Sequence, residues 1–199
     1  MRGSLRWLLV AVTTAAILPV QADAHFQLLA PASWLVENKL GDPQKSAPCA
    51  GTLADPGIPT SVVTDAVGGS TIKLRVLETI YHPGHYRVAL AVSSRAELPP
   101  DPETVTRETE KGPRSVSTVI QSPVRPPLLA DGLFPHTSRP AEPWEADIQL
   151  PNISCEKCTL QVVQFMAEHP GVREGGFSYH HCADLKITAD PSKPIDTGW

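Results

Sequence analysis

Short stretches of alternating hydrophobic and polar residues recur along this chain. The clearest covers residues 71–77, where three aliphatic side chains alternate with a threonine, a lysine and an arginine. This period of two predicts a β-strand with one face toward a core and one toward water. Other segments of strand character are residues 26–29, 86–92, 144–150, 159–166 and 179–188. Turn residues divide these segments and no helical period repeats, so the pattern predicts an antiparallel β-sandwich.

Long irregular segments separate the predicted strands. Residues 37–59 combine charges, glycines and prolines, which indicates a surface loop. Residues 97–143 are rich in proline, charge, serine and threonine, with only a weak apolar segment at residues 116–120, so we expect a long loop insertion there. Residues 189–199 have the composition of a polar tail. The 21 prolines of the chain argue against a helical bundle.

The first 24 residues have the composition of a secretory signal peptide. Two arginines flank the start, an apolar run extends from Trp7 to Val20, and small residues at 22–24 form a cleavage pattern. The run is shorter than the roughly 20 residues that a membrane-spanning helix requires, and no later run approaches that length. We therefore expect cleavage after Ala24 and a single soluble domain of residues 25–199, secreted or periplasmic and not attached to a membrane.

The net charge bears on the expected binding partners, and the cysteine content on the expected disulfides. The formal net charge is −4 and the lysines and arginines form no cluster, which argues against nucleic acid and anionic lipid. All four cysteines follow the signal peptide, and an even number in an oxidising compartment favours two disulfides over free thiols. Four cysteines allow three pairings. We favour Cys155 with Cys158 as a local link, and Cys49 with Cys182 as a tie between the start of the domain and its last strand.

A zinc site is the alternative for the Cys155-x-x-Cys158 motif. His180 and His181 would complete its four ligands. Structural zinc sites usually combine such a motif with further ligands at a matching spacing, and this chain has no second cysteine pair. The expected export of the protein also favours the disulfide.

Cleavage after Ala24 would make His25 the first residue of the mature chain. A terminal histidine can bind one metal ion through its α-amine and its ring Nδ1, a chelate that no internal histidine can form. The α-amine has an ordinary pKa of about 7.7 to 8.0, so its deprotonation costs little near neutral pH. One further imidazole would complete the planar arrangement of three nitrogens that Cu(II) prefers. The sequence therefore predicts a site for one copper ion per chain.

Three features of the mature chain resemble a known family. They are the terminal His25, a His-Pro-Gly turn that begins at His82, and residues 179–185, which read Tyr-His-His-Cys-Ala-Asp-Leu. In this order they are similar to lytic polysaccharide monooxygenases and their bacterial monooxygenase-like relatives. The resemblance implies an immunoglobulin-like or fibronectin III-like sandwich in which His25 and His82 form a histidine brace on copper, with Tyr179 in the axial position. It leaves residues 97–143 uncovered.

The sequence departs from that family at two points. His85 stands where fungal cellulose-active members carry a proline, so His85 is an alternative brace ligand. If His82 is the ligand, which its spacing to the glycine favours, we expect His85 next to it. Phe177 stands where those members carry a glutamine that donates a hydrogen bond next to the metal. We expect Gln164 to supply this donor instead.

The resemblance implies a copper-dependent oxidative cleavage of glycosidic bonds in a polysaccharide, at C1 or C4, with an external reductant. The residues implied in catalysis are His25, His82 and Tyr179. Trp34 and Tyr81 are candidate aromatic contacts for the polysaccharide, and we expect a monomer. The remaining histidines His136 and His169 are expected at the surface.

Two other functions stay open. The first is a copper-binding protein without oxidative activity, serving copper uptake or homeostasis, which fits the missing glutamine. The second is an exported β-sandwich interaction domain whose histidines bind no metal. Metal stoichiometry would separate the second from the others, and activity on polysaccharides would separate the first.

Overall fold

The computed structural model describes residues 24–52, 54–170 and 176–199. The predicted signal peptide, apart from Ala24, lies outside these residues. The described elements in chain order are β1 (His25–Ala30), β2 (Val63–Val67), β3 (Thr71–Ile80), β4 (Gly84–Ala91), the 3-10 helix η1 (Arg95–Glu97), β5 (Thr104–Thr109), β6 (Gly112–Thr118), β7 (Leu128–His136), β8 (Trp144–Gln149), β9 (Cys155–Met166) and β10 (Ser178–Thr188). None of the helices found in these ranges has the length and apolar character needed to cross a membrane.

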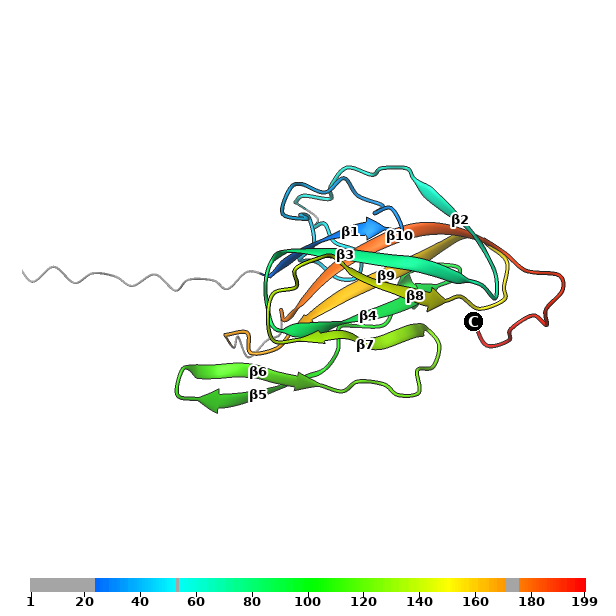
Figure 1. Ribbon diagram of the computed structural model, residues 1–199. Helices are drawn as coiled ribbons and strands as arrows, with labels where there is room; N and C mark the ends of the chain where they lie inside the picture. Colours follow the sequence, from blue (N-terminus) through cyan, green and yellow to red (C-terminus); the bar gives the residue numbers. More distant parts are fainter. Residues whose placement is uncertain (1–23, 53, 171–175) are drawn as a thin grey trace, which may run out of the picture.

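Two sheets pack against each other, and a separate hairpin lies beside them (Figure 1). The smaller sheet has the strand order β1-β3-β8, and the larger has the order β2-β10-β9-β4-β7. Strands β5 and β6 form the hairpin. The predicted all-β sandwich is confirmed, but its larger sheet is mixed because β2 runs parallel to β10. The two strands are far apart in the sequence, so no tight hairpin, which would require an antiparallel pair, joins them.

The alternation read from the sequence accounts for the core. Leu74 and Val76 of β3 are fully buried and face Tyr86, Val162 and Leu185 of the larger sheet. Each buried aliphatic side chain contributes about 1.5–3 kcal/mol relative to exposure. The two inner faces therefore supply the main stabilisation of the sandwich.

Strand β4 is buried on both faces, unlike a strand with one wet face. Its outer side chains Ala89 and Ala91 join a second, smaller apolar cluster with Leu98, Leu128 and the Cys49–Cys182 disulfide. The segments after β4 thus cover the outer face of the larger sheet. This covering is the structural role of a region that carried little periodic signal.

The expectation of a long loop at residues 97–143 is corrected by the structure. This region contains β5, β6 and β7, and β7 completes the larger sheet by pairing with β4. The pairing has three register shifts, and β7 contains both a glycine and a proline. Proline and glycine are tolerated on an edge strand, where one side of the backbone needs no ladder partner. Because of these residues β7 does not alternate between apolar and polar side chains, so the sequence pattern did not predict it as a strand.

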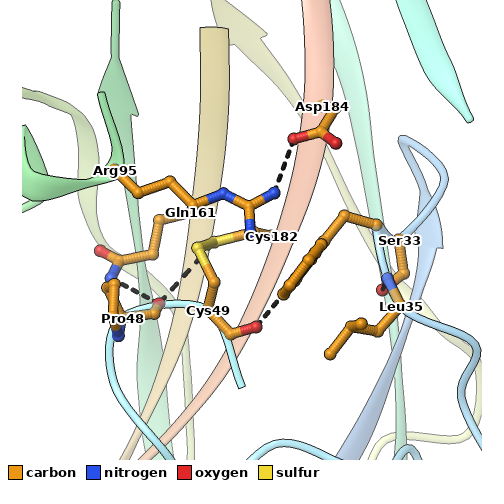
Figure 2. The surroundings of a disulfide bond; sticks show 9 residues. Ser33, Leu35, Pro48, Cys49, Arg95, Gln161, Cys182 and Asp184 are labelled. Atoms are coloured by element: carbon orange, nitrogen blue, oxygen red, sulfur yellow. Dashed lines mark hydrogen bonds and ion pairs between the residues drawn. A yellow bond between two sulfur atoms is a disulfide. The ribbon is translucent and has the colours of Figure 1, made fainter. Parts of the chain in front are cut away.

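Both favoured cysteine pairs are bonded in the structure, Cys49 with Cys182 and Cys155 with Cys158. Figure 2 shows the first, which fastens the loop after β1 to β10. Beside it the Gln161 side chain donates a hydrogen bond of 2.9 Å to the Pro48 carbonyl. The loop is thus held covalently and through the neighbouring strand β9.

The segment after β10 is anchored to the body of the protein through Asn152. The Asn152 amide nitrogen donates to the carbonyls of Asp190, Lys193 and Pro194 at 2.8–3.1 Å, and its oxygen accepts from the Asp190 amide at 2.7 Å. The predicted polar tail is therefore docked on a buried side chain, and Lys193 adds a hydrogen bond to the Gly69 carbonyl at 2.7 Å.

Candidate metal centre

The start of β1, the β3–β4 connection and the start of β10 meet at one end of the sandwich (Figure 1). His25 opens β1 and pairs with Ile80, the last residue of β3. The chain then reaches His82 two residues later. Three segments that carry the predicted ligands are thus brought to the same end by the sheet topology.

His25 is buried, with 4% of its surface exposed. Its Nε2 lies 3.4 Å from an Asp42 carboxylate oxygen. Its Nδ1 is also buried and has no hydrogen-bond partner among the described residues. Burying a polar nitrogen without a hydrogen-bond partner costs folding free energy. A ligand bound to this atom would remove that cost. Nδ1 is the ring nitrogen that a terminal-histidine chelate would use.

Asp42 reaches His25 because the loop of residues 37–44 lies directly against β1. Gly41 has a φ of +99°, and any side chain there would overlap the Phe26 carbonyl. Gln44 adds a second tie, since its side-chain oxygen accepts from the Phe26 amide at 3.0 Å. A positive φ and close backbone approach are conditions that favour glycine. The loop therefore orients the His25 ring through its far nitrogen.

Tyr179 lies next to His25 at the start of β10. The two ring centroids are 5.3 Å apart, in an edge-to-face arrangement with an interplanar angle of 62°. Tyr179 is buried in the main core cluster. The structure therefore brings together two of the predicted site residues that are far apart in the sequence.

His82 lies in the turn between β3 and β4. Its Nδ1 is 3.1 Å from the Pro83 carbonyl oxygen. Because a carbonyl only accepts, Nδ1 carries the hydrogen and Nε2 of the neutral ring keeps its lone pair. Burial lowers the pKa of His82 below its ordinary value, and nearby His169 lowers it further, against a smaller opposing effect of the Pro83 contact. Burial thus favours the neutral form that metal binding requires.

Gly84 explains the glycine of the His-Pro-Gly turn. A side chain at this position would overlap the Phe165 carbonyl of the neighbouring strand β9. The turn can therefore approach β9 only with glycine at residue 84. The position of the His82 backbone depends on this close approach, because the turn that carries His82 joins β4 at Gly84.

His85, the alternative brace ligand, faces away from Tyr179. His85 is opposite Phe165 in the β4–β9 ladder, whereas Tyr86 and Gln164 form the next pair and Gln164 is opposite Tyr179. Successive side chains of a strand point to opposite faces. Tyr179 and Tyr86 both belong to the inner core, so His85 lies on the outer face, with its ring 5.1 Å from that of Phe165. This geometry favours His82 over His85.

Gln164 lies opposite Tyr179 but is directed into the core. Its side chain is completely buried, and its amide nitrogen donates to Glu78 at 2.7 Å. Its amide oxygen is buried without a partner among the described residues. Gln164 is therefore close to the predicted centre, but its amide nitrogen donates to the buried carboxylate of Glu78.

The expectation of a surface position for His136 is wrong. His136 is 9% exposed, and its Nε2 lies 2.8 Å from both Glu78 and the His82 carbonyl. Burial lowers the pKa of His136, but the contacts with Glu78, Phe134 and His82 together raise it above its ordinary value. Glu78 itself was missed, although it continues the inward alternation of β3 as a polar residue in a core position. That break in the pattern was the available signal.

The zinc alternative is not supported by the geometry. Cys155 and Cys158 are bonded to each other and lie opposite Ile187 and Leu185, at the far end of the β9–β10 ladder from His180. His180 contacts Asp101 at 2.6 Å on the outer face. His181 points inward, where Nε2 is 3.0 Å from the Phe26 carbonyl and Nδ1 is 3.2 Å from Glu37. Both histidines therefore have structural partners away from the cysteines.

The two candidate aromatic contacts differ in their surroundings. Trp34 donates from its indole nitrogen to the Cys49 carbonyl at 2.7 Å, and the Arg95 guanidinium covers its ring at 3.7 Å. Arg95 in turn pairs with Asp184 (Figure 2). Tyr81 adjoins His82 and is half-buried. Of the two, only Tyr81 lies next to the candidate centre.

Within residues 24–52, 54–170 and 176–199, no three histidine, cysteine, aspartate or glutamate side chains form a metal-binding group. A histidine brace does not need such a triplet, because one of its three nitrogens is a terminal amine. His25 follows Ala24 in the described chain, so this amine would exist only after cleavage. Neither a scan against protein-family models nor a search of curated proteins finds a match to this chain.

Proposed function

We propose that the chain is an exported copper-binding protein, similar to the lytic polysaccharide monooxygenases, that matures by cleavage before His25. The ligands would be the His25 α-amine and Nδ1 and the His82 Nε2, and Tyr179 lies beside His25. The sandwich that holds them would be immunoglobulin-like or fibronectin III-like. The observation that carries the proposal is the buried, unpartnered Nδ1 of His25. Its other ring nitrogen faces Asp42, which leaves Nδ1 as the donor for a chelate.

The surrounding residues fit a copper ion of this kind. Neutral imidazole nitrogens suit copper, and the Pro83 contact leaves Nε2 of His82 as the nitrogen with a lone pair. Tyr179 packs its ring against His25 and so limits access from that side. Ala24 is fully buried, so its removal would uncover the position beside the new amine.

Bound copper would supply one-electron redox chemistry that activates oxygen or peroxide for attack on a C–H bond beside a glycosidic linkage. The protein side chains hold and orient its ligands: Asp42 orients His25, and the Gly84 turn places His82. An external reductant and a polysaccharide would be the partners. The two disulfides are typical of the oxidising compartment in which such a protein would act.

A copper-binding protein without oxidative activity is the second candidate. It is favoured by the surroundings of two residues, since Trp34 is covered by Arg95 and Gln164 is committed to Glu78. Neither side chain is then available for a polysaccharide or for a donor at the metal. This candidate shares the copper site and differs only in its use.

Copper binding is tested with mature protein whose N-terminus is verified by intact mass. Calorimetric titration should give one tight Cu(II) per chain, and a matched protein with one extra alanine before His25 should lose that site. Equal binding by both proteins would exclude the terminal chelate. Absence of binding to both would leave the non-metal interaction domain as the remaining function.

Activity is tested on the copper-loaded mature protein with ascorbate and peroxide. A panel of chitin, cellulose and other glucans should yield oxidised oligosaccharides, detected by mass spectrometry. The protein with the extra alanine is the control for reactions of free copper. Tight copper binding without products on the whole panel would favour the copper-handling candidate.

A further inference from the structure

Glu78 is a buried carboxylate at the interface between the two sheets. Its side chain has no exposed surface. Its Oε1 accepts hydrogen bonds from the Gln164 amide at 2.7 Å and the Tyr86 hydroxyl at 3.3 Å, and Nε2 of His136 lies 2.8 Å from it. A buried charge is tolerated only when it is paired and hydrogen-bonded. The three donors, which come from three strands of the larger sheet, meet that requirement at Oε1, while Oε2 is buried without a partner among the described residues.

His136 completes this cluster as its cationic member. Its Nδ1 lies 2.6 Å from the Phe134 carbonyl, and its Nε2 lies 2.8 Å from both Glu78 and the His82 carbonyl. All of these partners are acceptors. A hydrogen on each ring nitrogen satisfies them together, so His136 is the imidazolium partner of the Glu78 carboxylate.

The same Nε2 joins the ion pair to the turn that carries His82. Glu78 belongs to β3, while His136 ends β7 on the far edge of the larger sheet. The β3–β4 turn is also held at Pro83, whose carbonyl accepts from the Ala167 amide at 2.8 Å, and at Gly84, where it enters β4. The contact to the His82 carbonyl therefore fixes the backbone at the residue whose ring is the proposed ligand.

We propose that His136, held by Glu78, is a positioning residue of the copper centre that sets the backbone of His82. This inference rests on the proposed function for its consequence at the metal. Groups that orient metal ligands typically contribute 10–100-fold to metal affinity. His136 reaches the ligand through its main chain, so the ring of His82 keeps its own Pro83 contact.

A pair of substitutions separates this role from a general contribution to folding. His136→Gln keeps an amide donor near the position of Nε2, whereas His136→Asn places its amide near Nδ1 and leaves the His82 carbonyl without a donor. Both variants are polar and remove the cationic charge. Asn152→Ala is the matched control, because it releases the terminal segment at the opposite end of the sandwich.

The expected result is a 10–100-fold weaker Cu(II) affinity for His136→Asn, with altered copper hyperfine coupling in the electron paramagnetic resonance spectrum. His136→Gln should recover most of the affinity, and Asn152→Ala should lower the melting temperature without changing the affinity. Wild-type affinity and spectrum in folded His136→Asn would overturn the proposal. Equal weakening by Asn152→Ala would also overturn it, since loss of stability alone would then suffice.

A metal-free measurement keeps the inference independent of copper binding. Amide hydrogen exchange at Tyr81, His82 and Gly84 and the ring resonances of His82 should change in His136→Asn and not in Asn152→Ala. Unchanged exchange and resonances in His136→Asn would refute the positioning role. If the wild-type protein binds no copper, the proposed function fails, while this measurement still decides whether His136 sets the His82 turn.

Discussion

Replacing Glu37 with glutamine should change how the stability of the metal-free protein depends on pH. Burial raises the pKa of Glu37 to about 7 from an ordinary value of 4.5, against smaller opposing effects of Ser33 and the Leu28 amide. Glu37 contacts Nδ1 of His181, whose pKa burial lowers to about 4. Because Nε2 of His181 donates to the Phe26 carbonyl, a protonated Glu37 can donate to Nδ1. Glutamine reproduces this neutral donor and does not titrate.

The sign follows from the protons bound in each state. Between pH 4.5 and 7 the folded protein keeps the Glu37 proton that the unfolded chain has lost, so Glu37 makes stability fall as pH rises. The interval of 2.5 pKa units corresponds to about 3 kcal/mol. His181 acts in the opposite direction between pH 4 and 6.5, because the unfolded chain binds the proton and the folded protein does not. The two effects cancel in the wild type over most of this range.

The variant removes only one side of this balance. Relative to the wild type, Glu37→Gln should gain about 3 kcal/mol in unfolding free energy between pH 4.5 and 7. Urea unfolding of both proteins at half-unit pH steps measures this difference, and titrations elsewhere in the chain cancel in the comparison. A difference that stays constant within about 1 kcal/mol across the range would refute a raised pKa for Glu37.

Three further perturbations follow from the fold. Gly84→Ala should destabilise the protein by about 1–3 kcal/mol in chemical unfolding, because the new methyl group meets the Phe165 carbonyl; wild-type stability would contradict that close approach. Replacing Cys49 and Cys182 by serine should cost about 2–5 kcal/mol, since this disulfide spans a sequence separation of 133 residues, and an unchanged melting temperature would contradict it. Asn152 stands in an Asn-Ile-Ser glycosylation motif but is buried and bonded to the terminal segment; folded protein should remain unmodified there in a mass spectrum, whereas Asn152→Ala should make residues 189–199 sensitive to protease.

The proposed copper site combines a local feature with a long-range one. The chelating nitrogens of His25 would belong to one residue and arise from a single cleavage. The third nitrogen has to come from another part of the chain, and the β1–β3 pairing of His25 with Ile80 brings the His82 turn to the same end of the sandwich. Copper binding would therefore depend on both processing and folding.

The sequence by itself determined the features that depend on near neighbours in the chain. Alternation predicted β3, β4 and β8 because side chains of a strand point alternately to its two faces. Compartment and spacing favoured the Cys155–Cys158 and Cys49–Cys182 pairs, which the structure contains. Strand alternation involves only neighbouring residues, and four cysteines allow only three pairings, so both could be predicted without the tertiary structure.

The tertiary structure decided which distant side chains share a face. Sequence spacing left His82 and His85 as alternatives, and only the β4–β9–β10 register puts His85 on the face opposite Tyr179. Likewise His136 has no motif that marks it as buried, and its contacts with Glu78 and the His82 carbonyl arise where β7 meets the β3–β4 turn. These contacts depend on sheet pairing and packing across more than fifty residues, which a local pattern of polarity does not encode.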